Sequence, residues 1–205
     1  MLLKINNKNP ESRLINQVVE VVKKGGIIIY PTDTVYGLGC SIFNKKAMQR
    51  MYQIKKMNHK KPLTFVCANQ TEIQEYSNGI PTHVFKFLRR QLPGPYTFVF
   101  RASKIVPKMM LTPRKTVGFR WPNHPIANSI VSSLGHPILS SSLRISEDEL
   151  YDNPYDIHKK YNKKVDLIVD GGSIFAENST IIDFTNLEPN ITRIGKGSID
   201  WLDQS

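Results

Sequence analysis

The chain lacks the features of a membrane-spanning or a disulfide-rich protein. Its 205 residues contain no apolar run of about 18 residues, the length that a membrane-spanning helix requires. The first eight residues, MLLKINNK, lack the long apolar stretch and the cleavage site of a signal peptide. Only two cysteines are present, Cys40 and Cys67, and both lie in or beside apolar strands, so we expect buried free thiols. These absences predict a cytoplasmic protein without a membrane partner.

Acidic residues are few, and residues with the spacing of a metal site are absent. The 17 Asp and Glu residues stand against 28 Lys and Arg residues, which gives a net charge of +11. An excess of positive charge suits polyanionic partners such as ATP, pyrophosphate or RNA, although a solvated basic surface gives the same composition. The five histidines show no zinc spacing, so we expect no metal held by the protein itself.

Helical and strand patterns alternate along the chain, which predicts an α/β fold in a single domain over residues 1–205. Asn9, Asn44 and Asn153 are the expected first caps of three of the helices. We expect helices at about 10–24, 44–55, 72–76, 82–91, 125–133 and 154–161, and strands at about 27–30, 63–67, 96–102, 116–120, 138–142, 167–169, 180–183 and 191–194.

The most informative segment covers residues 25–41, GGIIIYPTDTVYGLGCS. Its apolar strand runs into Pro31, which ends the strand because proline cannot donate to a β-ladder. A loop rich in hydroxyls and glycines follows, with Asp33 as its one carboxylate. A polar loop at the carboxyl end of a strand is a common ligand site in α/β sheets, and glycines let the backbone approach a small molecule. The segment therefore predicts a small-molecule site.

Residues 30–40, YPTDTVYGLGC, resemble the signature of threonylcarbamoyl-adenylate synthases of the YrdC type. The resemblance extends from about residue 9 to the end of the chain. It implies a YrdC-type fold, in which a twisted mixed β-sheet flanked by helices surrounds one deep basic pocket. Further segments match in the family's order: PGPYT at 93–97, TVGFRWPNHPIA at 116–127, VDLIVDGG at 165–172, NSTIID at 178–183 and RIGKG at 193–197.

The same resemblance implies a nucleotidyltransferase activity. Enzymes of this type join L-threonine, bicarbonate and ATP, the last with Mg²⁺, into threonylcarbamoyl-AMP and release pyrophosphate. The product serves the formation of N6-threonylcarbamoyladenosine (t6A) in tRNA. Such a transfer depends on positioning and on charge stabilisation more than on covalent chemistry from the protein. The chain offers no evident nucleophile or catalytic triad, which agrees with that demand.

Site residues follow by matching positions. Thr116 and Arg120 alternate on one predicted strand, as do Ser140 and Ser142 on another, so each pair shares a face of the sheet. An arginine within an apolar strand must be paired if it is buried. The resemblance implies threonine-binding roles for Thr34, Arg120, Ser140 and Ser179, and nucleotide-binding roles for Lys55, Lys61, Thr116, Ser142, Arg144 and Arg193.

The chain departs from the synthase pattern at four positions, as the YciO branch of the family does. Met57 replaces the second basic residue of a Lys-x-Arg motif, Arg144 replaces the asparagine of Ser-x-Asn, and Lys61 and Val66 replace an asparagine and a histidine. Two interpretations stay open. Either nearby cations restore the lost charge, or the triphosphate site is degraded and the chain is a protein that binds nucleotides or double-stranded RNA. The cations that could restore this charge are Lys56, Lys60, Lys61 and Arg144.

Overall fold

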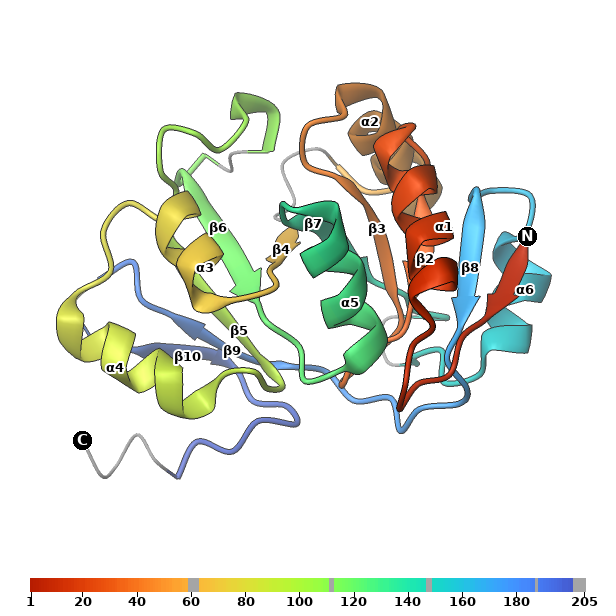
Figure 1. Ribbon diagram of the computed structural model, residues 1–205. Coiled ribbons are helices and arrows are strands. Elements are labelled where there is room, and N and C mark those ends of the chain that lie inside the picture. Colours follow the sequence, from red (N-terminus) through yellow and green to blue (C-terminus); the bar gives the residue numbers. More distant parts are fainter. Residues whose placement is uncertain (59–62, 111–112, 147–148, 187, 201–205) are drawn as a thin grey trace.

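The computed structural model describes residues 1–58, 63–110, 113–146, 149–186 and 188–200 of the chain. Helices and strands alternate in it, and one large twisted sheet runs through the molecule (Figure 1). The helices are α1 (Ser12–Lys23), α2 (Lys45–Lys55), α3 (Gln70–Tyr76), α4 (Thr82–Gln91), α5 (Pro125–Leu134) and α6 (Pro154–Tyr161). The strands are β1 (Leu2–Lys4), β2 (Ile28–Tyr30), β3 (Gly37–Ser41), β4 (Thr64–Val66), β5 (Tyr96–Arg101), β6 (Thr116–Arg120), β7 (Ile138–Ser142), β8 (Leu167–Asp170), β9 (Thr180–Asp183) and β10 (Asn190–Arg193).

The sheet has ten strands in the order β1-β8-β2-β3-β7-β4-β6-β5-β9-β10. It is mixed, because β2 and β8, β4 and β6, and β5 and β9 pair in parallel, whereas β3 pairs antiparallel with β2 and β7. The predicted α/β class with a twisted mixed sheet is confirmed. Over the residues that the structure describes, no helix has the length and apolar character needed to cross a bilayer.

Two hydrophobic clusters hold the helices on the sheet. One joins apolar residues of the sheet to α2, α3, α4 and α6, and the other joins the sheet to α1 and α5. The alternation of side chains along a strand produces this division, as β4 illustrates: Phe65 belongs to the first cluster and its neighbour Val66 to the second. Helices α1 and α5 lie side by side (Figure 1). Both expected cysteines are free and buried.

Three local expectations were wrong. Helix α1 begins at Ser12 instead of Pro10, because Asn6 Oδ1 accepts hydrogen bonds from the backbone of residues 8 and 9 and folds them into a turn. Strand β1 was not expected. Residues 37–41, assigned to the ligand loop, form strand β3, because glycine at 37 and 39 leaves room for the Tyr30 ring on the neighbouring strand.

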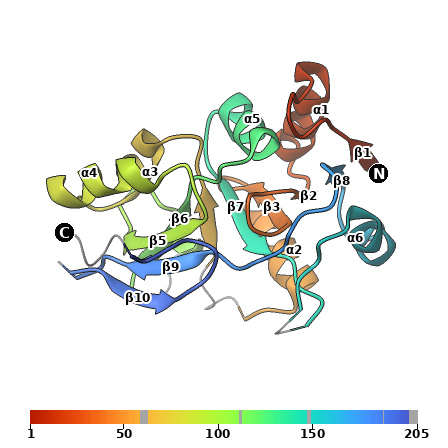
Figure 2. The same ribbon diagram turned by 90° about the horizontal axis from the view of Figure 1, so that it is seen from below.

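A long crossover, residues 171–179, connects β8 to β9, and we call it the strap. Six strands lie between β8 and β9, so on a flat sheet the strap would span seven strand spacings, about 34 Å. Ten residue steps reach at most about 33–36 Å, and although the twist of the sheet shortens the path, the strap has little slack. Figure 2 shows it running across the molecule between the two strands.

Candidate functional site

A row of polar side chains lies on one face of the sheet, and strand register brings them together. Ser140 pairs with Gly39 on one side and with Thr64 on the other, and Thr64 pairs with Gly118. Paired residues of neighbouring strands project from the same face of a sheet. We call this surface the polar face; its side chains are Thr64, Thr97, Thr116, Arg120, Ser140 and Ser142.

Glycines let neighbouring side chains approach the backbone closely on the polar face. A Cβ atom built at Gly37 would lie 2.9 Å from Ser140 Oγ and 3.2 Å from the Tyr30 ring. A Cβ atom at Gly118 would lie 3.2 Å from Thr97 Cγ2. Side chains at these positions would therefore cover the hydroxyls that the neighbouring strands present.

The loop after β2 is held rigidly at the edge of this face. Thr32 and Thr34 are buried, and their Oγ1 atoms are 3.1 Å apart. Thr32 Oγ1 also donates to the backbone oxygen of Val35 at 2.6 Å. The backbone oxygen of Thr34 accepts a hydrogen bond from Glu177 N of the strap at 3.0 Å. Thr34 thus occupies a fixed position between the sheet and the strap.

Arg120, at the end of β6, forms a buried ion pair. Its Nη2 donates to Asp33 Oδ1 at 2.5 Å, and the two side chains are only 8% and 10% exposed. The other carboxylate oxygen, Asp33 Oδ2, accepts from Asn123 N at 3.0 Å, and Lys196 Nζ donates to the Asp33 backbone oxygen at 2.7 Å. Arg120 Nε is buried and has no hydrogen-bond partner among the described residues. A buried arginine was expected to be paired, and Asp33 is the partner.

Two serines on this side of the sheet are held by neighbouring hydroxyls. Tyr30 OH donates to Ser140 Oγ at 2.8 Å, and burial raises the pKa of Tyr30 to about 12, so the phenol stays protonated. Ser179 Oγ lies 2.8 Å from Thr97 Oγ1, and Arg193 donates to both the backbone oxygen and the hydroxyl of Ser179. Both serines therefore present fixed hydroxyls.

Three cations from distant parts of the chain gather beside the polar face, and we call Lys55, Arg144 and Arg193 the cation cluster. Lys55 Nζ donates to the backbone oxygen of Ser142 at 2.6 Å. Burial, and secondly the nearby Arg144, lower the pKa of Lys55 to about 8. Burial, and then the charges of Arg144 and Arg120, lower the pKa of Arg193. Arg144 thus lies close enough to both Lys55 and Arg193 for its charge to act on them, and an anion bound there would relieve the repulsion.

The structure brings most of the residues predicted from the sequence to one region, but Lys61 lies outside the described residues. Sequence reasoning missed the partners that fix them: Thr64 and Thr97 on the sheet, Asn178 on the strap and Lys196 near the end of the chain. Asp33 was noted only as a loop carboxylate. A buried Arg120 requires a counter-charge, and this requirement was a sequence signal for the role of Asp33.

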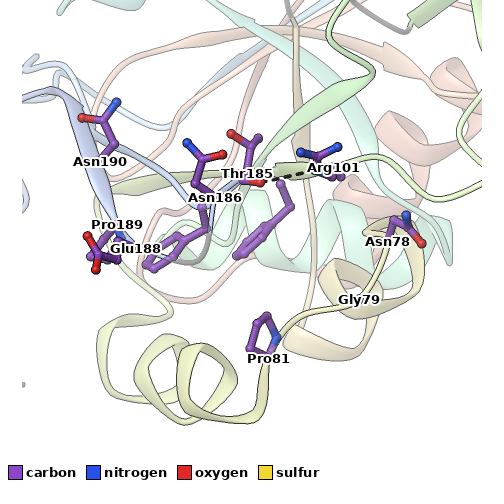
Figure 3. Close-up of a pocket in the computed structure, with 11 residues that line it drawn as sticks. Asn78, Gly79, Pro81, Arg101, Thr185, Asn186, Glu188, Pro189 and Asn190 are labelled. Carbon is purple, nitrogen blue, oxygen red and sulfur yellow. Dashed lines mark hydrogen bonds between the residues drawn. The ribbon is translucent and has the colours of Figure 1, made fainter.

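A pocket of about 840 Å³ lies elsewhere, between the segment joining α3 to α4, the end of β5 and the turn from β9 to β10 (Figure 3). Arg101 Nε donates to the backbone oxygen of Thr185 on its wall, and the lining contains one basic residue, Arg101, and one acidic residue, Glu188. None of the predicted site residues lines this pocket, and it is not basic. The deep basic pocket expected at the polar face stays a prediction.

Comparison with known proteins identifies the family. A family model for Sua5, YciO and YrdC proteins, described as "Telomere recombination", matches residues 20–195. The chain belongs to this family. It is 40% identical to the uncharacterised YciO protein of Escherichia coli over 197 residues, which cover 95% of each chain. The crystal structure of E. coli YciO superposes with a TM-score of 0.93 at 39% identity and covers 98% of both chains.

Threonylcarbamoyl-AMP synthases are more distant relatives. The synthase of Pyrococcus abyssi is 29% identical over 175 residues, which cover 85% of this chain and 52% of the synthase. A crystal structure of P. abyssi Sua5 complexed with L-threonine matches with a TM-score of 0.89 at 27% identity, covering 95% of this chain and 57% of that one. The fold and the family are therefore shared with threonylcarbamoyl-AMP synthases, and this chain spans a little over half the length of the P. abyssi enzyme.

Proposed function

We propose that this protein is an enzyme of the threonylcarbamoyl-AMP synthase type, which uses L-threonine, bicarbonate and ATP in the pathway to t6A in tRNA. The observation that carries the proposal is the polar face itself. Hydroxyls and one buried arginine, suited to an amino acid, lie beside a cation cluster, suited to a triphosphate. The likeness to an L-threonine-bound Sua5 supports the amino-acid half of the proposal.

The amino-acid half rests on Arg120 and its surroundings. Arg120 Nη2 donates to Asp33, which fixes the orientation of the guanidinium. Arg120 Nε is then left to donate to the carboxylate of threonine. The hydroxyls of Ser140 and Ser179 are oriented by Tyr30 and Thr97 and are suited to the polar atoms of the same ligand. In this arrangement the threonine amine faces bicarbonate without a covalent link to the protein.

The nucleotide half rests on charge. The threonine amine condenses with bicarbonate to a carbamate, with a C–O bond broken and water released. A carbamate oxygen then attacks the α-phosphorus of ATP, and pyrophosphate leaves with the electrons of the broken P–O bond. Negative charge grows on the leaving pyrophosphate, and Lys55, Arg144 and Arg193 would offset it in a partly water-excluded site. Thr116 and Ser142 would contribute hydroxyls from the polar face.

Magnesium enters this proposal as part of the substrate, Mg-ATP. Asp33 does not fit as a ligand of a resident ion, because Arg120 and the backbone of Asn123 already use its two oxygens. Phosphate oxygens and water are the usual ligands of Mg²⁺ in such complexes.

A second possible function, the binding of nucleotides or double-stranded RNA, is supported by a separate observation on Met57. Met57 packs its side chain against the hydrophobic cluster at the end of α2, so this position supplies no cation to a triphosphate. Together with the net charge of +11, this supports a protein that binds nucleotides or double-stranded RNA with little adenylate formation.

One experiment separates the two functions. Pyrophosphate release from ATP is measured with L-threonine and bicarbonate, and again with each omitted. Release that requires both supports the synthase. The absence of release, together with RNA binding that weakens steeply as salt rises, would support the binding protein. Arg120→Gln removes the guanidinium but keeps a polar side chain, and it is expected to abolish threonine-dependent release; because it also leaves Asp33 without its counter-charge, the result counts only for protein that circular dichroism shows to be folded.

A further inference from the structure

Arg144 acts on both other members of the cation cluster, yet it extends from a short segment after β7 and not from one of the ten strands or six helices. Its guanidinium depresses the pKa of both Lys55 and Arg193, which come from α2 and β10. An arginine side chain has several rotatable bonds and costs about 2 kcal/mol of rotamer entropy to fix. Repulsion from two neighbouring cations would also drive it away from the cluster. Something must therefore hold Arg144 in place.

The strap supplies a fixed oxygen for this purpose. Arg144 Nη2 donates to Asn178 Oδ1 at 2.8 Å. The backbone on both sides of Asn178 is fixed: Glu177 N donates to the Thr34 backbone oxygen, and the Asn178 backbone oxygen accepts from Lys196 N at 2.8 Å. A Cβ atom at Gly195 would lie 2.2 Å from the same oxygen of Asn178, so the two segments lie in close contact. The amide is presented from rigid backbone.

We propose that Asn178 is a positioning residue that holds Arg144 toward the phosphate groups of a bound nucleotide. The proposal rests on the proposed function only in taking the cation cluster as an anion subsite. An amide oxygen suits this role better than a carboxylate, because it orients the guanidinium without neutralising the charge that the anion needs.

A double-mutant cycle on anion binding tests the proposal. Calorimetry with inorganic tripolyphosphate is carried out on the parent, Asn178→Ala, Arg144→Gln and the double variant. We expect Asn178→Ala to weaken binding about 5–10-fold, which lies within the range typical of one lost hydrogen bond. In the Arg144→Gln background the same change is expected to alter affinity less than twofold, because Asn178 acts through Arg144. Asn190→Ala, on the pocket of Figure 3, is the matched control and should bind as the parent does.

A merely structural role for Asn178 predicts different results. It would lower affinity equally with and without Arg144, and it would also weaken L-threonine binding, because Ser179 follows Asn178 on the strap. Either result overturns the proposal, as does a parent protein that fails to bind tripolyphosphate or an Asn178→Ala variant with unchanged affinity. If the double-mutant cycle gives the expected affinities but the protein never releases pyrophosphate, the synthase function is refuted and the positioning role of Asn178 is retained.

Discussion

Removal of the Asp33 carboxylate should destabilise the protein severely. Asp33 and Arg120 form an ion pair at 2.5 Å, and their side chains are only 10% and 8% exposed. Asp33→Ala leaves a guanidinium buried without its counter-charge. Breaking a buried pair in this way costs about 3–5 kcal/mol. In a domain of this size each kcal/mol lowers Tm by about 2–4 °C, so we expect Tm to fall by about 6–20 °C.

Urea unfolding followed by circular dichroism measures the loss, with Glu20→Ala as the matched control. Glu20 pairs with Lys23 at 3.7 Å, but the two side chains are 57% and 52% exposed, and such a pair contributes less than about 1 kcal/mol. The variant Asp33→Ala/Arg120→Met, which removes both charges, should recover much of the lost stability. If Asp33→Ala costs no more than Glu20→Ala, or if the double variant is as unstable as Asp33→Ala alone, the buried-charge argument fails.

Three further predictions concern the site. Affinity for tripolyphosphate should fall as pH rises from 7 to 9, because Lys55, whose pKa is lowered to about 8, loses its proton over this range. In the Lys55→Arg variant the affinity should change little between pH 7 and 9, because arginine keeps its charge. Gly37→Ala should cost about 1–3 kcal/mol in urea unfolding, because the added methyl group meets Ser140 Oγ at 2.9 Å; a cost below 0.5 kcal/mol would contradict this. Met57→Arg combined with Arg144→Asn should raise threonine- and bicarbonate-dependent pyrophosphate release; a parent as fast as a synthase relative would show that the site is not degraded.

Local sequence signals predicted many elements well and failed where distant segments meet. Helix 82–91 and strands 116–120 and 138–142 have the bounds expected from their patterns, because strong apolar periodicity and flanking breakers fix them locally. Strand β3 was missed because its glycines resemble those of a loop. They belong to a strand here because the Tyr30 ring, contributed by β2, fills the space above them. Strand propensity describes single residues and does not take the neighbouring Tyr30 ring into account.

The site shows the same limit. Alternation on β6 and β7 predicted which side chains share a face, since it depends only on the period of a strand. The strap could not be placed from its sequence, because its path depends on β8 and β9 being separated by six other strands. Asn178 and Lys196 acquire their roles only through that path. Asp33 is the intermediate case, because a buried arginine requires a carboxylate and the loop contains a single one.

We interpret two of the four departures from the synthase pattern, Met57 and Arg144, as one physical change. Helix α2 ends in a left-handed residue, Lys56, and the next residue turns back so that Met57 N bonds to the Tyr52 backbone oxygen and its side chain packs on the core. A cation at position 57 would lose that packing. Positive charge is instead contributed by Arg144, from the end of β7, where the strap supplies an oxygen to hold it. Under the proposed function, Arg144 would supply positive charge from a segment held by the strap, and adenylate formation would depend on whether the strap sets the required geometry.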